Sequence, residues 1–143
     1  MQQLWLKRNP LLPAGATRVA DMLRLNRHLV VLDLVNTGIL DSGALAILRS
    51  LGAPHAADGG PTVGTENVNR TLRHLYLDGN GLTVSSAKVI CEYLSTGKNK
   101  LVTLSVGCNR FGDEGAAYIC SGICQDSAVQ RLILASVGIG KQG

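Results

Sequence analysis

Apolar residues recur along this chain with a spacing that neither a simple helix nor a simple strand explains. In the stretch from Leu72 to Leu82, apolar residues stand at relative positions 1, 4, 6 and 11, and an asparagine stands at position 9. Leu75 and Leu77 alternate with the period of a short strand. Asn80 marks a turn, because its side-chain amide can bond neighbouring backbone groups. The pattern therefore predicts a strand followed by a turn.

The same frame occurs five times, with copies that begin at residues 1, 29, 72, 101 and 129. The gaps between these starts are 28, 43, 29 and 28 residues. They indicate one unit of about 28 residues, with a single insertion of about 15 between the second and third copies. We expect the residues at position 9 to form a ladder of buried turn amides, which a threonine weakens and a valine interrupts. These residues are Asn9, Thr37, Asn80, Asn109 and Val137.

The second half of each full unit has the period of a helix. Apolar residues at positions 16, 19 and 23 follow the i, i+3, i+7 stripe of one helical face. Gly15, Gly43 and Gly115 precede the alanine at position 16 in three of the units, and a small residue there allows one helix start to approach its neighbour. The alanines are Ala16, Ala44, Ala87 and Ala116.

A unit of this length, built from a strand, an asparagine turn, Gly-Ala and a full helix, resembles the ribonuclease-inhibitor-like subtype of the leucine-rich repeat. The resemblance covers all of the chain except about residues 53–69. It implies an α/β fold, a right-handed solenoid forming part of a horseshoe, with a parallel sheet on the concave face and helices on the convex face. We expect one leucine-rich repeat domain over residues 1–143, whose fifth repeat stops before its helix.

The truncated fifth repeat implies that the chain is a piece of a longer solenoid or that another element covers its last strand. A terminal repeat without a cap exposes apolar core. We therefore expect the chain to self-associate through its uncapped ends or to fray in repeat five. The residues concerned are Met1, Leu4, Leu6, Leu132, Leu134 and Ile139.

The insertion at about residues 53–69 carries Pro54, Gly59, Gly60, Pro61 and Gly64 and follows neither period. Such a composition predicts a loop, at a place where repeat proteins accept insertions. Two interpretations stay open. The segment is either a surface loop or a flap that contacts a partner over one rim of the horseshoe.

Composition favours an intracellular, cytoplasmic protein. A content of 45% hydrophobic but only 3% aromatic residues suits a core of stacked aliphatic ladders. No apolar run reaches the length of about 18 residues that a transmembrane helix needs, and the first residues lack the apolar core of a secretory signal. The cysteines show none of the motifs that seal extracellular leucine-rich repeats. They are Cys91, Cys108, Cys120 and Cys124.

Cys91 and Cys120 share repeat position 20, so we expect them to stack in the helical layer as small buried hydrophobes. A metal site or a disulfide is the alternative for Cys120 and Cys124, which are four residues apart. The histidines lie in other units without zinc spacing. We expect no metal and no cofactor.

Function must come from the exposed surface, because the ladders explain only the fold. Side chains at positions 3, 5 and 7 of each strand are expected to form rows on the concave face. Trp, Tyr and Arg are the types enriched at binding hot spots, although a few exposed aromatic residues are ordinary. The predicted partner-binding residues are Trp5, Lys7, Asp33, His74, Tyr76, Asp78, Ser105, Arg131 and Ile133.

The net charge of +4 and the pI of about 9.1 raise the question of nucleic-acid binding. Lysine and arginine are dispersed over every repeat, and no basic strip with interleaved aromatic residues appears in the sequence. We therefore expect neither a nucleic-acid nor a membrane partner. The positive charge still favours encounters with anionic partners.

Catalysis finds little support in the sequence, since no nucleophile with a neighbouring base and no paired carboxylates stand at plausible spacing. We expect a protein–protein interaction module that is not an enzyme. The resemblance also admits a GTPase-activating protein of the Ran-activator type. Its arginine motif has no counterpart that can be placed here, and Arg8 and Arg110 are the loop arginines that would test it.

Overall fold

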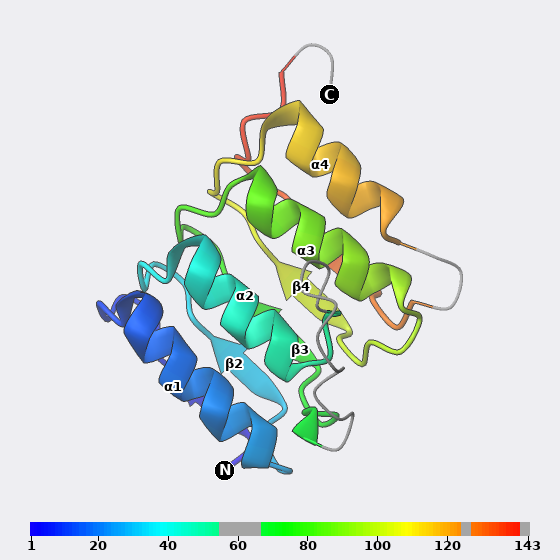
Figure 1. Cartoon of the computed structure of the whole chain (residues 1–143). Coiled ribbons are helices and arrows are strands. Elements are labelled where there is room, and N and C mark those ends of the chain that lie inside the picture. Colours follow the sequence, from blue (N-terminus) through cyan, green and yellow to red (C-terminus); the bar gives the residue numbers. More distant parts are fainter. Residues whose placement is uncertain (55–66, 124–126, 141–143) are drawn as a thin grey trace.

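The computed structural model describes residues 1–54, 67–123 and 127–140. Strands and helices alternate along these residues, and all five strands pair in parallel in chain order. The strands are β1 (Gln3–Trp5), β2 (Val31–Asp33), β3 (His74–Tyr76), β4 (Thr103–Ser105) and β5 (Arg131–Ile133). The helices are α1 (Leu12–Leu25), α2 (Leu40–Ser50), α3 (Val84–Ser95) and α4 (Gly112–Ser121). Figure 1 shows the helices side by side in one layer that covers one face of the sheet. The fold is the predicted α/β solenoid.

Equivalent residues of the repeats lie side by side in the sheet. The leucine at position 4 is in register across every pair of strands. It is fully buried in the three middle repeats, as Leu32, Leu75 and Leu104, and partly buried at the two ends, as Leu4 and Leu132. A middle repeat is covered from both sides, whereas each end repeat has one described neighbour, so the core is densest in the middle.

Small residues at the helix starts bring neighbouring helices close together, as the sequence predicts. A Cβ atom added at Gly43 would lie 2.8 Å from the Cβ of Ala16, and one added at Gly115 would lie 3.3 Å from the Cβ of Ala87. Real Cβ atoms do not approach as closely as the first of these distances. Glycine at position 15 therefore sets the packing of α1 on α2 and of α3 on α4.

The asparagine ladder runs through the middle of the solenoid. The amide of Asn80 donates to the carbonyls of Leu34 at 2.8 Å and Leu77 at 3.0 Å. Its side-chain oxygen accepts from the backbone of Thr37 at 3.1 Å and of Ile39 at 3.3 Å, both in the preceding repeat. Asn109 repeats the arrangement one unit later. Its side-chain oxygen accepts from the backbone N–H groups of Asn80 and Leu82, both in repeat three.

The ladder is shorter than the sequence predicts. Asn9 is exposed, and its amide donates only within its own turn, to Leu6 and Lys7. The expectation that it begins a ladder of buried amides is wrong, because no described repeat precedes it to cover the turn. Thr37 supplies its hydroxyl to the carbonyl of Leu34, as expected, and Val137 is buried without a polar group to continue the ladder.

Asp41 ties the start of α2 to the start of α3, a contact that the repeat pattern does not reveal. Its carboxylate accepts hydrogen bonds from the Thr83 backbone at 2.9 Å, from the Thr83 hydroxyl at 2.7 Å and from the Ser86 hydroxyl. Ser86 stands where the other helices carry glycine. Burial raises the pKa of Asp41, but the bonds from Ser86 and Thr83 outweigh it, so the pKa lies below its usual value of 3.8.

The free energy of unfolding is expected to fall at acid pH, because the carboxylate of Asp41 becomes protonated. A carboxyl whose pKa is lower in the folded state stabilises the fold above its unfolded pKa, and this contribution is lost as the pH falls from about 4 through the folded pKa. Asp41→Asn should lower the free energy of unfolding by about 1 to 3 kcal/mol at pH 7 and flatten its dependence on pH in that range. Denaturant titrations at several pH values measure both effects.

Asp21→Asn is the matched control, because Asp21 makes only an exposed ion pair of 2.8 Å with Arg24. Its removal should change stability by less than about 1 kcal/mol. An acid profile that is the same for Asp41→Asn and the unaltered chain would rule out the role assigned to Asp41.

The predicted insertion at about residues 53–69 is narrower in the structure at both ends. Ala53 is buried in the core. Asn69 is also buried, and its amide donates to the carbonyls of Leu23 at 3.0 Å and Asn26 at 2.9 Å, so it belongs to the solenoid. Residues 55–66, on which the loop and flap interpretations rest, lie outside the described residues, and both interpretations stay predictions.

The cysteines do not form the predicted buried stack. Cys120 is exposed and Cys91 is half-buried, with its sulfur 3.5 Å from the hydroxyl of Ser121. Cys120 lies in α4, the last described helix. No described helix packs on the outer side of α4, which leaves Cys120 uncovered. The thiols of Cys91, Cys108 and Cys120 are free, and Cys124 lies outside the described residues.

Two further features concern the predicted ends and the membrane. Met1 is 75% exposed and Ile139 is 47% exposed, so apolar surface is present in both the first and the fifth repeat. Self-association through this surface stays a prediction. None of the described helices is both long enough and apolar enough to cross a membrane.

Candidate functional site on the concave face

One row of side chains crosses the concave face at strand position 5. The register of the sheet places its five members next to one another, one from each repeat. With strands about 4.8 Å apart, every second member is about 10 Å away. In chain order the row reads Trp5, Asp33, Tyr76, Ser105 and Ile133.

Trp5 is the most exposed aromatic residue on this face. More than half of its surface, 55%, is open to solvent. The ammonium group of Lys7, two residues further along the same repeat, lies 5.6 Å from the centre of the indole ring. This cation–π contact holds the exposed ring against a charged neighbour. Trp5 and Lys7 therefore form one surface element at the N-terminal end of the sheet.

Asp33 and Ser105 are buried, contrary to the expectation that they are accessible to a partner. Only 5% and 3% of their surfaces are exposed. Both are short side chains between bulkier neighbours in the row, and both use their polar groups internally. Asp33 accepts from the backbone of Val35 at 3.0 Å, and Ser105 donates to Asp78 at 2.7 Å.

The row therefore alternates between large and small side chains. Tyr76 and Ile133 are half-buried and flank Ser105, and Trp5 and Tyr76 flank Asp33. A partner that approaches this face meets three apolar side chains about 10 Å apart.

The remaining predicted residues lie beside this row. His74 in β3 and Arg131 in β5 both stand at position 3 of their repeats. His74 is half-buried and Arg131 is exposed. Asp78 is half-buried, because its carboxylate also accepts from the backbone of Gly107 at 2.9 Å. The structure thus brings Lys7 and Trp5 together at one end, His74 and Tyr76 together in the middle, and Arg131 and Ile133 together at the other end.

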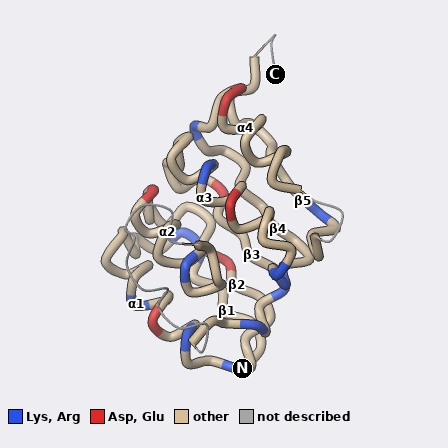
Figure 2. Tube along the Cα trace, turned by 45° about the vertical axis from the view of Figure 1, so that its right-hand side comes forward, with Lys and Arg blue, Asp and Glu red and all other residues tan. Residues whose placement is uncertain are grey.

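A group of cations lies at the rim of the sheet, although the sequence pattern does not single it out. Arg70, Lys98 and Lys100 line one cavity together with Tyr93. Figure 2 shows Lys and Arg segments gathered beside β3 and β4. Cations that are dispersed along the sequence become neighbours here, because a solenoid places residues one repeat apart side by side. Their shared place just before a strand is the signal that could have revealed them.

Other chemistry finds no support among the described residues. No group of three or more His, Cys, Asp or Glu side chains there could hold a metal ion. Arg8 and Arg110 are both exposed, but they belong to the first and fourth repeats. The GTPase-activator alternative stays a prediction.

Comparison with known proteins agrees with this architecture. The family model described as leucine-rich repeat matches residues 25–48, 68–91 and 97–120, which together make up half of the chain. The chain is 28% identical over its whole length to NACHT, LRR and PYD domains-containing protein 12 of Mus musculus. It is 25% identical over 92% of its length to ribonuclease inhibitor of Mus musculus.

A third relative, protein CARMIL of Dictyostelium discoideum, is 33% identical over 42% of the chain and 6% of its own length. The chain spans only 15% of the first relative and 25% of ribonuclease inhibitor. The matched segments coincide with the helices and strands of the middle repeats, where the leucine at position 4 is fully buried. The chain therefore belongs to the leucine-rich repeat family and is of the ribonuclease-inhibitor-like type.

Proposed function

We propose that the chain binds a protein partner on its concave strand face and acts as a binding module, not as an enzyme. Leucine-rich repeats generally mediate protein–protein interaction. The observation that carries the proposal is the exposed ring of Trp5, which lies in the same row as Tyr76 and makes a cation–π contact with Lys7. A large aromatic residue that stays open to solvent on a regular sheet is a common anchor of protein interfaces.

The other side chains of the face support this assignment. Tyr76 and Ile133 provide further apolar contacts at intervals of about 10 Å. Lys7 and Arg131 place exposed positive charge near the two ends of the row. The nearby carboxylates of Asp33 and Asp78 already accept hydrogen bonds from their own chain. Both carboxylates keep their negative charge, but Asp33 is buried and Asp78 is half-buried, whereas the cations at the two ends of the row are exposed. The charges that a partner meets first are therefore positive, which favours an acidic protein surface at these two ends.

The relatives support the class of function. Ribonuclease inhibitor is named for its action on another protein, a ribonuclease. A role in binding another protein is therefore consistent with this similarity. The partner of the present chain is proposed here only by its chemistry, as a protein with an acidic surface that accepts an aromatic side chain.

Trp5→Ala is expected to weaken partner binding by at least about 30-fold, the effect of losing one hot-spot side chain. The partner is first captured from a lysate and purified, and its affinity for each variant is then measured by calorimetry. Thermal unfolding of the variant should stay close to that of the unaltered chain, because the Trp5 side chain is exposed and removing it leaves no cavity in the core.

Leu25→Ala is the matched control. Leu25 is 78% exposed at the end of α1, so its removal deletes an exposed apolar side chain away from the concave face. Its affinity should stay within about twofold of the unaltered chain. A partner that is lost equally with Leu25→Ala and Trp5→Ala, or only with Leu25→Ala, would place binding elsewhere.

A further inference from the structure

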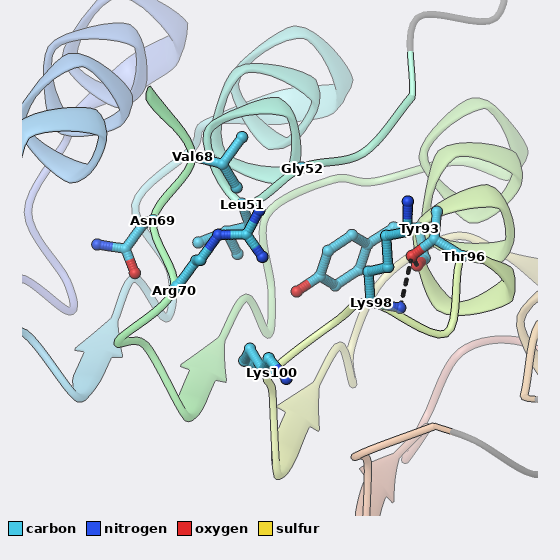
Figure 3. A pocket seen from close by; sticks show the side chains of 9 residues that line it. All are labelled: Leu51, Gly52, Val68, Asn69, Arg70, Tyr93, Thr96, Lys98 and Lys100. Atoms are coloured by element: carbon cyan, nitrogen blue, oxygen red, sulfur yellow. Dashed lines mark hydrogen bonds between the residues drawn. The ribbon is translucent and has the colours of Figure 1, made fainter. Parts of the chain in front are cut away.

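A cavity of about 90 Å³ lies at the rim of the solenoid, where repeats two and three meet. Its walls come from the C-terminal ends of α2 and α3 and from the segments that lead into β3 and β4. Leu51, Val68 and Tyr93 provide an apolar lining. Figure 3 shows these side chains around the space between the two helix ends.

The cavity carries a concentration of positive charge. Arg70, Lys98 and Lys100 all line it, and no acidic residue is among its described lining residues. A fourth cation, Arg73, acts electrostatically on the Tyr93 phenol. We call this site the cationic cavity.

Part of this charge offsets the negative ends of two helices. The C-terminus of a helix carries about half a negative charge, so α2 and α3 together contribute about one. The three lining cations therefore leave a surplus of about two positive charges. Complementing the helix ends does not account for the whole group.

Tyr93 provides a hydrogen-bond donor inside the cationic cavity. Its side chain is 2% exposed, and Figure 3 shows its phenol oxygen pointing toward the space between Arg70 and Lys100. Burial raises the pKa of Tyr93 far above its usual value, although the Lys100 backbone and the Arg73 charge act in the opposite direction. The hydroxyl thus keeps its proton at neutral pH. Among the described residues, this hydroxyl donates no hydrogen bond to another side chain or to the backbone.

We propose that the cationic cavity binds a phosphate group, held by Arg70, Lys98, Lys100 and the hydroxyl of Tyr93. A volume of about 90 Å³ exceeds what a single water molecule needs and leaves room for one small tetrahedral oxyanion. A phosphate monoester carries a charge close to −2 at neutral pH and so matches the surplus. A carboxylate, with a single charge, would leave half of the surplus uncompensated.

Nucleic acid fits the cationic cavity less well. Each phosphodiester carries one charge, and proteins that bind single strands combine a basic groove with aromatic side chains on which bases stack. Tyr93 is buried, so its ring offers no stacking surface. The proposal concerns a rim of the solenoid and does not depend on partner binding at the concave face.

The test is a titration of the full chain with inorganic phosphate and, separately, with O-phosphoserine, at constant ionic strength. We expect saturable binding at one site, followed by NMR shifts of the residues around Tyr93, and no binding of serine. The affinity for O-phosphoserine should rise between about pH 5.5 and 7.5, because its phosphate group loses its second proton with a pKa of about 6. Tighter binding of O-phosphoserine would identify a phosphorylated side chain as the source, and tighter binding of inorganic phosphate would identify the free ion.

Charge-removing variants locate the site. Lys98→Gln and Lys100→Gln should each weaken phosphate binding about tenfold, because each removes one charge-assisted contact. Both side chains are exposed, so the variants should fold normally. Arg18→Gln removes the same charge from the exposed side of α1 and should leave the affinity within about twofold. Tyr93→Phe should weaken binding by removing only the hydroxyl.

Three results would overturn the proposal. Equal losses for Arg18→Gln and Lys98→Gln would show that only the overall charge attracts the anion. Acetate that binds as tightly as phosphate would show a site for a single negative charge. An RNA oligonucleotide that binds more tightly than phosphate and loses affinity with Lys98→Gln would assign these cations to nucleic acid.

Discussion

Asn80→Ala is expected to lower the free energy of unfolding by about 4 kcal/mol or more. The side chain is 1% exposed and joins two repeats. Its removal leaves the buried N–H groups of Thr37 and Ile39 without their acceptor, and it takes one donor each from the carbonyls of Leu34 and Leu77. Each unpaired buried group costs about 1 to 3 kcal/mol, and water entering the vacated space recovers only part of this. Urea unfolding followed by circular dichroism measures the loss.

Asn9→Ala is the control for this prediction. Asn9 stands at the same position of its repeat, but it is exposed and its amide bonds only its own turn. Its removal should cost less than about 1 kcal/mol, because water replaces the lost bonds. If the two alanine variants are equally stable, the ladder does not contribute in the way that its geometry indicates.

Leu104→Ala is expected to lower the free energy of unfolding by about 2 to 5 kcal/mol, the usual range for a leucine in a rigid core. Leu104 is fully buried in β4, between Leu75 of β3 and Leu132 of β5. Both neighbours belong to the repeating frame, and the surrounding ladder has little freedom to collapse into the cavity. Chemical unfolding again provides the measurement.

Leu132→Ala removes the same side chain from the same repeat position, where it is only partly buried. Its cost should be clearly smaller than that of Leu104→Ala, because less surface leaves water at this position when the chain folds. A loss below about 0.5 kcal/mol for Leu104→Ala would contradict the assigned register. Equal losses for the two leucines would contradict the difference in burial between the middle and the ends.

The repeating frame made the fold predictable from the sequence. Leucines at fixed positions determine which residues become neighbours, so the frame implies the parallel pairing of Leu75 with Leu104 before any coordinates are known. The Gly-Ala start of α1, α2 and α4 likewise indicates close packing, which the positions of Gly43 and Ala16 confirm.

Exposure on the concave face was harder to predict, because it depends on the size of the neighbouring side chains. Asp33 has the same outward strand position as Trp5, yet its short side chain is covered and bonds its own backbone. The position within the repeat indicates the direction in which a side chain points. The size of the neighbouring side chains in the row determines whether solvent reaches it. Asp78 shows the same limit, since Ser105 and Gly107 of the next repeat occupy its carboxylate.

The cationic cavity was harder to predict for a different reason. Arg70 and Lys98 are separated by a whole repeat in the sequence, and the cavity exists only where two helix ends and two loops meet. Asp41 is similar, because its partners Thr83 and Ser86 lie beyond the insertion. Contacts that a single repeat makes outside the frame are not visible in the frame itself.

The asparagine ladder also has a direction, which matters when the chain is synthesised. The backbone N–H groups of Thr37 and Ile39 find their acceptor on Asn80, and those of repeat three find theirs on Asn109. Each of these turns is thus completed by the repeat that follows it. A ribosome releases the N-terminal repeats first. The N–H groups of Thr37 and Ile39 therefore gain their acceptor only after Asn80 has left the exit tunnel, so this part of the ladder forms one repeat behind translation.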